Sequence, residues 1–361
     1  MNVLVIVGGR SPEHAISLRS GRSVIQALDK SKYQISVVGI DKNGDWQLQE
    51  RDDFLLYADD NKLIALKPSV RPVYLETIGK STYLCSKIDN QKHTKIDIVF
   101  PVLHGPFGED GVVQGLFRSA NVAFVGVDLM ASAIGMDKDV AKRLWRDAGI
   151  PIARFEVIDK HNKSKINYEQ LARYLGAPLF VKPANAGSSV GVHKVTSEAE
   201  FQAAIADGLQ YDRKLLVEEA IKGIEVECAI LGNENPKASV IGAIMPTDKF
   251  YSYDAKYISS TGAKLQIPAD ISDATSRKIK RLAIKAFRCI GAEGLSRVDF
   301  FLTADGRLVL NEINTMPGFT SISMYPKLWE ASGISYSQLL DKLIKLGIQR
   351  HKKMSKLKMV W

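Results

Sequence analysis

Apolar runs separated by polar and glycine-rich sequence mark the first third of the chain. Residues 3–7, 34–40 and 96–102 are short, largely apolar runs of the kind found in buried parallel strands. Strands that alternate with helical stretches predict a parallel sheet covered by helices, so residues 1–127 are expected to form an α/β domain. Residues 44–95 are polar and interrupted by prolines, and they are expected to be an insertion in this domain.

Two polar loops follow the first and third of these runs. Ser11 is the expected N-cap of a helix and Pro12 its first residue, which places Glu13 in the first turn. The loop at 103–111 holds three glycines and three titratable residues. Ligands of α/β sheets gather at the carboxyl ends of the strands, so both loops are expected to face one crevice. The alternatives are a Glu13 that only favours the helix dipole and a loop of exposed charges.

A phosphate-binding arrangement is predicted further along the chain. A helix should begin near Lys138, where a lysine is disfavoured by the helix dipole unless an anion lies nearby. Lys182 ends an apolar strand, and the loop 184–192 that follows is rich in small residues. Such a loop can close over phosphates with its backbone N–H groups and with the hydroxyls of Ser188 and Ser189. A flexible hairpin without a ligand is the alternative.

Acidic residues follow the next apolar strand. Glu218 and Glu219 end that strand, and Glu225 comes shortly after it. A nucleotide base could lie along this backbone, with a carboxylate accepting hydrogen bonds from the ribose hydroxyls. The aromatic and polar stretch 250–262 shows no periodicity, as expected of a lid over such a site, and a surface loop is the alternative.

A polar face is expected on a hairpin near the C-terminal end. Arg297 and Asp299 are two residues apart in an apolar run, and Glu312 and Asn314 repeat that spacing in the next run. The Asp305-Gly306 step between the runs suits a tight turn, so the two strands should pair and present all four groups together. Two carboxylates and an amide oxygen suit Mg²⁺, and an arginine beside them suggests a phosphate or a developing oxyanion. The alternative is a solvated sheet face.

Composition and charge narrow the protein class. The chain has 361 residues and a formal net charge of +9, and residues 341–361 carry most of that excess. Cations at the end of a helix account for this tail better than nucleic-acid binding does. No apolar stretch is long enough for a membrane span, and no basic region precedes the first apolar run, so neither a span nor a signal peptide is expected. The three cysteines are far apart and fit a reducing compartment, so a cytoplasmic location is expected.

The chain resembles the ATP-grasp ligases and, more closely, the D-alanine-D-alanine ligase family. The motifs that carry the resemblance are SPEHAIS, HGPFGEDG, GMDK, VKPANAGSSVG, EEAIKGIE, YDAKY, RVDF and NEINTMPGFTSIS. Only the insertion and the basic tail fall outside it. The chain differs from many members at Ala15, where a glutamate is common, and at His193, where a serine is common. These differences concern fine positioning and not the reaction.

The resemblance implies a fold in which ATP lies between two sheets. An N-terminal parallel α/β domain (1–127) would precede a central ATP-grasp subdomain (128–220) and a C-terminal one (221–361) with the metal site and the basic tail. The implied reaction joins two D-alanine molecules, with ATP, through a D-alanyl phosphate, for peptidoglycan synthesis. Two Mg²⁺ or Mn²⁺ ions would be required. A related ligase with D-lactate or D-serine as second substrate is the alternative within the family, and YDAKY resembles the D-alanine pattern.

The resemblance also assigns residues and partners. The implied catalytic residues are Glu13, Ser188, Tyr257, Arg297 and Gly318. The implied substrate-binding residues are Glu13, His104, Glu109, Lys256 and Ser323. The implied ATP-binding residues are Lys138, Lys182, Ser188, Ser189, Glu218, Glu219, Ile221 and Glu225. The implied metal ligands are Asp299, Glu312 and Asn314. A homodimer with small-molecule substrates is expected, with no nucleic-acid or membrane partner; a regulator with a dead nucleotide site would require the loss of a metal ligand or of Arg297.

Overall fold

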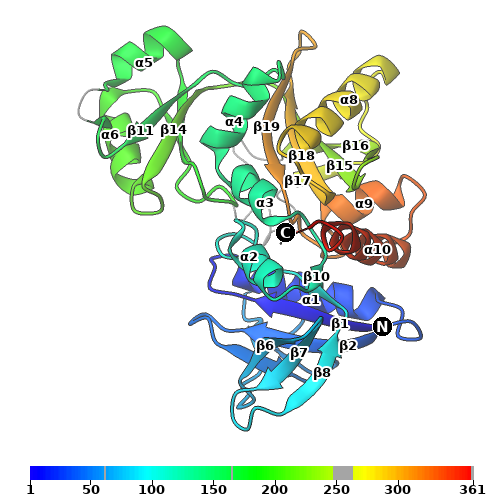
Figure 1. Ribbon diagram of the computed structural model, residues 1–361. Coiled ribbons are helices and arrows are strands. Elements are labelled where there is room, and N and C mark those ends of the chain that lie inside the picture. The colour runs from blue at the N-terminus through cyan, green and yellow to red at the C-terminus, as the bar shows by residue number, and fades with distance from the viewer. Residues whose placement is uncertain (61, 164–165, 247–262, 359–361) are drawn as a thin grey trace.

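The computed structural model describes residues 1–60, 62–163, 166–246 and 263–358 and has three lobes (Figure 1). The first lobe holds the N terminus and a five-stranded sheet, the second a four-stranded sheet, and the third another five-stranded sheet with the last helices. The mixed α/β class expected from the sequence is confirmed.

The N-terminal sheet has the strand order β10-β9-β1-β2-β3. Its strands are β1 (Asn2–Gly8), β2 (Gln34–Ile40), β3 (Trp46–Gln49), β9 (Ile98–Pro101) and β10 (Ala123–Phe124). All are parallel to their neighbours except β3, which runs antiparallel to β2. The predicted strands are therefore present, and the third is shorter at both ends than predicted. In this order the chain passes from β1 to β2 on one side and later to β9 on the other side. The strand order therefore reverses at β1.

The first helix, α1 (His14–Ala27), begins later than predicted. Its N-cap is Glu13, whereas Ser11 was expected in that place. The backbone N–H of His14 donates to the carbonyl of Ser11, and the N–H of Glu13 donates to the Ser11 hydroxyl at 3.1 Å. Residues 11–13 therefore form a turn of their own before the helix, which the Ser-Pro sequence does not distinguish from a helix start.

The predicted insertion forms small antiparallel sheets against the side of the first lobe. Its strands are β4 (Leu55–Leu56), β5 (Ala65–Leu66), β6 (Val73–Ile78), β7 (Ser81–Ser86) and β8 (Lys92–Ile96). Helix α2 (Val112–Ser119) returns the chain to β10. The three cysteines of the chain are free.

The second lobe follows helices α3 (Leu129–Met136) and α4 (Lys138–Asp147). Its antiparallel sheet has the order β11-β14-β12-β13. The strands are β11 (Phe155–Asp159), β12 (Leu179–Pro183), β13 (His193–Val195) and β14 (Lys214–Glu219). Helices α5 (Tyr168–Leu175) and α6 (Glu198–Gly208) cover one face of this sheet with a small apolar core, which leaves the other face for the third lobe.

The third lobe is an antiparallel sheet of order β17-β16-β15-β18-β19. Its strands are β15 (Ile224–Gly232), β16 (Lys237–Pro246), β17 (Ala263–Gln266), β18 (Gly294–Leu302) and β19 (Leu308–Asn314). Helix α8 (Asp273–Cys289) shares one core with this sheet and with α4. Helices α9 (Met324–Glu330) and α10 (Tyr336–Met354) share a second core with it, and the N-terminal sheet belongs to that core as well.

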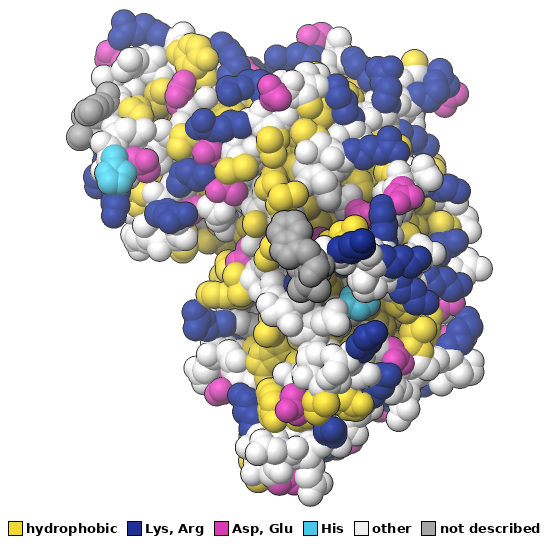
Figure 2. All heavy atoms as spheres, viewed as in Figure 1, with side chains coloured by type: hydrophobic (Ala, Val, Ile, Leu, Met, Phe, Trp, Pro, Cys, Tyr) yellow, Lys and Arg dark blue, Asp and Glu magenta, His cyan; other side chains and the backbone are white. Residues whose placement is uncertain are grey.

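Charge is distributed over the surface much as the sequence suggests. The basic tail lies at the end of α10, whose last turn holds His351, Lys352 and Lys353. Figure 2 shows Lys and Arg side chains scattered among acidic and hydrophobic ones on the visible face. Within the described ranges, no helix combines the length and the apolar character needed to cross a membrane.

Candidate active site

The predicted hairpin is formed by β18 and β19. The two strands are antiparallel, with Arg297 opposite Asn314 and Asp299 opposite Glu312. The register shifts after Asp299, so the bulge lies directly beside the polar groups. Because cross-strand partners project to the same face of a sheet, the four groups stand together as the sequence predicted.

Asp299 is the centre of this polar group. It is fully buried, and Arg297 donates to both of its carboxylate oxygens, from Nε to Oδ1 at 2.8 Å and from Nη2 to Oδ2 at 2.7 Å. Asn314 Nδ2 also donates to Asp299 Oδ2, at 2.9 Å. This pairing of a guanidinium with a carboxylate is two-pronged and fixes the plane of both groups.

Glu227 belongs to the same group and was missed by the sequence analysis. It is buried on β15 opposite Asp299, and its Oε2 lies 2.9 Å from Nε of Arg297. Glu225, Glu227 and Asp299 each offer a carboxylate oxygen, and these atoms lie within 4.8 Å of one another. Hard oxygen donors at this spacing fit a divalent cation such as Mg²⁺. The two-residue spacing of Glu225 and Glu227 could have predicted that both side chains lie on one face of a strand. What that face contacts depends on the register in which β15 pairs with β18.

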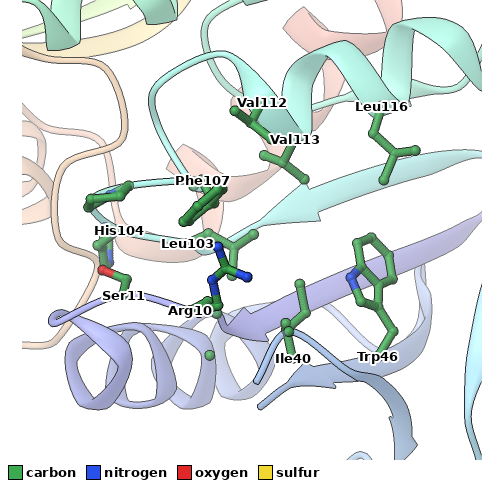
Figure 3. A pocket seen from close by; sticks show the side chains of 15 residues that line it. Arg10, Ser11, Ile40, Trp46, Leu103, His104, Phe107, Val112, Val113 and Leu116 are labelled. Atoms are coloured by element: carbon green, nitrogen blue, oxygen red, sulfur yellow. The ribbon is translucent and has the colours of Figure 1, made fainter. Parts of the chain in front are cut away.

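The loops of the N-terminal domain meet beside Glu13, where Gly105 approaches both Glu13 and Ser11. Figure 3 shows the turn that holds Ser11 next to the loop that holds His104. The Ser188 hydroxyl donates to Glu13 Oε1, which joins the first lobe to the small-residue loop of the second. A Cβ on Gly105 would lie 2.5 Å from Glu13 Oε2, so only glycine permits this approach. Glu109 Oε1 accepts from the Gly105 N–H at 2.7 Å.

His104 is held on both ring nitrogens. Nδ1 lies 3.0 Å from the carbonyl of Met316, and Nε2 lies 3.1 Å from the hydroxyl of Ser20. Burial lowers the pKa of His104 to about 4, although the hydrogen bond to Met316 opposes this. A neutral, fixed imidazole therefore supports the turn that begins at Met316.

That turn carries the predicted Gly318 and Ser323. A Cβ on Gly318 would lie 2.8 Å from the Ser323 hydroxyl, so a side chain there would displace Ser323. Thr320 N donates to the same hydroxyl at 3.0 Å. Lys256 and Tyr257 of the predicted set, with the lid stretch that contains them, lie outside the described residues.

Glu109 yields a prediction about pH. Burial and the nearby charge of Glu13 raise the pKa of Glu109 from 4.5 to about 8. The folded protein then keeps a proton that the unfolded chain has lost, so this group makes stability fall as pH rises from about 4.5 to about 8. The variant Glu109→Gln lacks this dependence. As pH rises through that range, the melting temperature of the variant should increase relative to that of the unchanged protein, and the difference should then level off. His104 contributes to both proteins and cancels, and parallel curves would contradict the prediction.

A cavity of about 360 Å³ lies between the sheets of the second and third lobes. The described residues that line it include every residue that the sequence analysis assigned to ATP, together with Glu312 of the metal set. These residues are Lys138, Lys182, Ser188, Ser189, Glu218, Glu219, Ile221 and Glu225. Lys138 Nζ donates to the carbonyl of Ala186 at 2.8 Å and lies 3.5 Å from Glu312 Oε2. The positive charge of Lys138 therefore lies in the same cavity as the polar hairpin.

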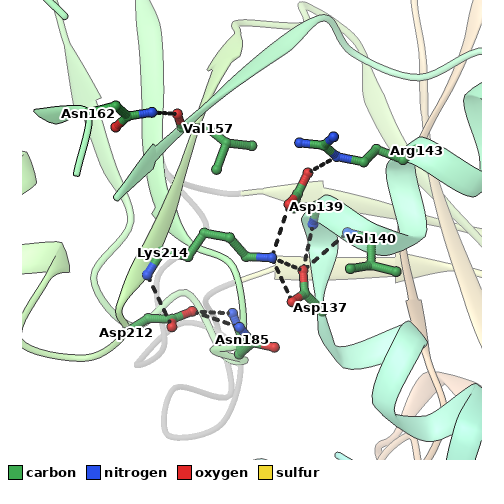
Figure 4. A network of polar contacts seen from close by, with 9 residues as sticks. All are labelled: Asp137, Asp139, Val140, Arg143, Val157, Asn162, Asn185, Asp212 and Lys214. Atoms are coloured by element: carbon green, nitrogen blue, oxygen red, sulfur yellow. Dashed lines mark hydrogen bonds and ion pairs between the residues drawn. The ribbon is translucent and has the colours of Figure 1, made fainter. Parts of the chain in front are cut away.

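The small-residue loop is anchored at its base by a polar network (Figure 4). Asn185 donates from its backbone N and its Nδ2 to Asp212 Oδ2, at 2.7 and 3.0 Å. Lys214 Nζ lies between Asp137, at 2.7 and 2.8 Å, and Asp139, at 3.0 Å. Asp137 also caps α4, directly before Lys138. The network therefore fixes Lys138 and the loop relative to one another.

A buried ion triad adjoins the cavity, whose lining includes Lys182 and Glu218. Glu218 Oε2 lies 2.8 Å from Lys182 Nζ, and Glu218 Oε1 lies 3.0 Å from Lys142 Nζ. Lys142 is 0% exposed, and burial lowers its pKa. Burial alone would raise the pKa of Glu218, but the two lysines outweigh it and the pKa is lowered. Lys142 was missed because its position on α4 is indistinguishable in sequence from a surface lysine.

Removing Lys142 should destabilise the fold. The variant Lys142→Met leaves Glu218 buried with one cation in place of two, and losing a partner of a buried charge costs about 3 kcal/mol. The free energy of unfolding, measured by urea denaturation, should fall by about that amount. Lys278→Met, at an exposed lysine of α8, is the matched control and should change little. An equal effect of the two substitutions would refute the role of Lys142.

A nucleotide-sized cavity between two antiparallel sheets, lined by lysines, carboxylates and a small-residue loop, defines the ATP-grasp class. Residues 2–127 match the family model described as D-ala D-ala ligase N-terminus, and residues 144–345 match the one described as D-ala D-ala ligase C-terminus. The chain therefore belongs to the D-alanine-D-alanine ligase family, and the resemblance noted in the sequence is confirmed.

Individual relatives agree over nearly the whole chain. A protein of Shouchella clausii named D-alanine-D-alanine ligase is 50% identical over 354 residues, which cover 98% of this chain and 96% of that one. The structure of the D-alanine-D-alanine ligase from Coxiella burnetii superposes with a TM-score of 0.84 at 36% identity, and the match covers 99% of this chain and 97% of the other. A D-Ala:D-Ser ligase from Enterococcus faecalis gives 0.83 at 36% identity, covering 96% and 99%.

Proposed function

We propose that this protein joins two D-alanine molecules to D-alanyl-D-alanine, with conversion of ATP to ADP and phosphate, as a step in peptidoglycan precursor synthesis. The observation that carries the proposal is the cavity between the two sheets, which collects the predicted ATP residues beside the carboxylates of the hairpin. The close relatives named for this activity support it. A second substrate other than D-alanine is not favoured, since the relatives at 47–50% identity are named D-alanine-D-alanine ligase.

ATP would lie with its phosphates toward Lys138 and Lys182 under the loop that carries Ser188 and Ser189. Its base would border residues 218–221, and Glu225 would accept from the ribose hydroxyls. Glu218 is already oriented by two lysines, so its position would not depend on the ligand. Asp299, Glu312 and Asn314 are oxygen donors that fit Mg²⁺ or Mn²⁺, and two such ions would neutralise phosphate charge during transfer.

The first D-alanine would place its ammonium near Glu13, with His104 and Glu109 supporting that pocket. Its carboxylate oxygen would attack the γ-phosphorus, the bond to ADP would break, and D-alanyl phosphate would form. The hydrogen bond between Ser188 and Glu13 would couple closure of the phosphate loop to occupancy of the amino-acid site. Tyr257 would extend this set from the lid.

The second D-alanine would attack the acyl carbon with its free amine. Ser323 and Lys256 would hold its carboxylate. The guanidinium of Arg297 and the N–H of Gly318 would stabilise the tetrahedral oxyanion, which collapses to the peptide bond with loss of phosphate. Arg297 is suited to this role because Glu227 and Asp299 hold its guanidinium in a fixed orientation.

The domain limits 1–127, 128–220 and 221–361 coincide with changes from one sheet to the next, which supports them. A homodimer and a cytoplasmic location stay predictions, and analytical ultracentrifugation and cell fractionation test them.

The activity is tested by phosphate release from ATP with D-alanine, L-alanine, D-serine or D-lactate, together with identification of the product by mass spectrometry. Release should depend on D-alanine, and the product should be the D,D-dipeptide. Phosphate release that is indifferent to D-alanine would refute the proposal. A mixed product with D-serine or D-lactate that outpaces the dipeptide would replace it by the alternative specificity.

A further inference from the structure

A second cavity, of about 220 Å³, opens in the N-terminal domain apart from the nucleotide cavity (Figure 3). Gly8 and Gly9 at the end of β1, Ile40 at the end of β2 and Leu103 after β9 are among the residues that line it. It therefore lies where the strand order reverses, at the carboxyl ends of the parallel strands. Open α/β sheets bind ligands in the crevice at this place.

The walls of the cavity are apolar, and apolar side chains surround its opening. Leu103 and Val113 are buried, whereas Phe107, Val112 and Leu116 are 43%, 56% and 46% exposed. Phe107 has a φ of 63°, an unusual conformation for an aromatic residue, and its N–H donates to Asp110 at 2.8 Å. Large apolar side chains gathered at one opening are typical of a ligand-binding site.

The polar groups that line the cavity and remain available are donors. The guanidinium of Arg10 lies 4.6 Å from the ring centre of Phe107, and it makes no hydrogen bond or ion pair with any residue in the described ranges. The indole N–H of Trp46 likewise donates to none of the described residues. Both nitrogens of His104 are engaged elsewhere. None of the lining residues is an Asp or a Glu.

We propose that this cavity binds a small molecule with one flat apolar ring and one carboxylate. A cavity of about 150 Å³ already accommodates benzene, so the volume suffices for a single substituted ring. The ring would lie among Leu103, Val113 and Leu116, and the carboxylate would accept from the fork of Arg10, which points in among the lining side chains (Figure 3). A neutral molecule of the same shape would lose that charge-assisted bond.

The site adjoins the first-substrate pocket through one loop. Residues 103–108 face the cavity with Leu103 and Phe107, while Gly105 faces Glu13 and Glu109 on the other side. A ligand that orders this loop would change the affinity for the first amino acid, and the change would be reciprocal. This coupling rests on the proposed function, whereas binding to the cavity does not.

Binding is tested with benzoate on the full-length protein by nuclear magnetic resonance of the indole N–H signals. The chain has four tryptophans, and Trp46→Phe assigns the signal of Trp46. Benzoate should shift this signal in a saturable way. Benzamide, which has the ring without the charge, and acetate, which has the charge without the ring, should each bind at least about tenfold more weakly.

Two variants complete the test. Arg10→Met should weaken benzoate binding about tenfold or more, since it removes a charged hydrogen-bond donor. Leu116→Trp should fill the opening from an exposed position and block binding, and Ile88→Trp, at an exposed residue of the insertion, should not. An unmoved Trp46 signal, equal affinity for benzamide, or unchanged binding in Arg10→Met would each overturn the proposal. Because binding is read without turnover, failure of the ligase activity would leave this result interpretable.

Discussion

Replacing Glu312 by glutamine should abolish ligation, with turnover falling at least about a thousandfold. The substitution keeps the shape of the side chain and removes one negative charge from the proposed metal site. Glu312 stands opposite Asp299 on the hairpin and 3.5 Å from Lys138, so it lies where the carboxylates meet the phosphate end of the cavity. Losing the charge should weaken cation binding and leave phosphate charge uncompensated during transfer.

The measurement is D-alanine-dependent phosphate release, with Mn²⁺ binding followed by electron paramagnetic resonance. Glu330→Gln, at an exposed glutamate of α9, is the matched control and should keep both properties. The melting temperature of Glu312→Gln should stay close to that of the unchanged protein, because the residue is only partly buried. Near-normal turnover, or normal Mn²⁺ affinity, would rule out Glu312 as a ligand.

Replacing Arg297 by methionine should lower the rate of dipeptide formation by about a hundred- to a thousandfold, the usual effect of removing one oxyanion donor. The effect should fall on the second half of the reaction, where the tetrahedral centre forms. Exchange of oxygen isotope positions within ATP in the presence of D-alanine reports reversible formation of the acyl phosphate, and it should persist in the variant. Loss of this exchange together with turnover would place Arg297 at the phosphoryl step instead.

Two further variants separate charge from geometry. Arg297→Lys keeps the cation but not the fork that contacts both oxygens of Asp299, so it should recover only a small part of the rate. Arg277→Met, at an exposed arginine of α8, should behave as the unchanged protein does. Full activity in Arg297→Lys would mean that charge alone is required at this position.

Local sequence patterns correctly predicted the features that depend on a single strand or a single loop. The alternation around Arg297 and Glu312 predicted a hairpin with a shared polar face, and the structure confirms it. The run at 34–40 predicted β2 with its observed limits. These predictions succeed because side-chain direction in a strand follows from position alone.

Long-range packing decided the features that the sequence did not predict. Lys142 lies on a helix with many charged residues, and only the docking of α4 beside Glu218 buries it. Glu227 meets Arg297 because β15 pairs with β18 in one particular register. The predicted start of α1 was wrong by two residues because the turn at Ser11 satisfies the backbone in a way that resembles a cap. For Lys142 and Glu227, the partner lies in another part of the fold. For α1, two similar local hydrogen-bonding arrangements compete, and the sequence does not choose between them.

The shared core beneath α10 has a consequence for synthesis of the chain. Helix α10 packs on α1, β9 and β10, and Arg350 donates to the carbonyls of Phe124 and Gly126. One face of the N-terminal sheet therefore shares its core with α1 and with residues 336–354, so its cover is complete only when α10 is in place. A ribosome would have to synthesise and release the chain through α10 before the first strands it made could complete their packing. The nascent N-terminal domain would thus expose apolar surface throughout translation and would be a substrate for chaperones until the last helix docks.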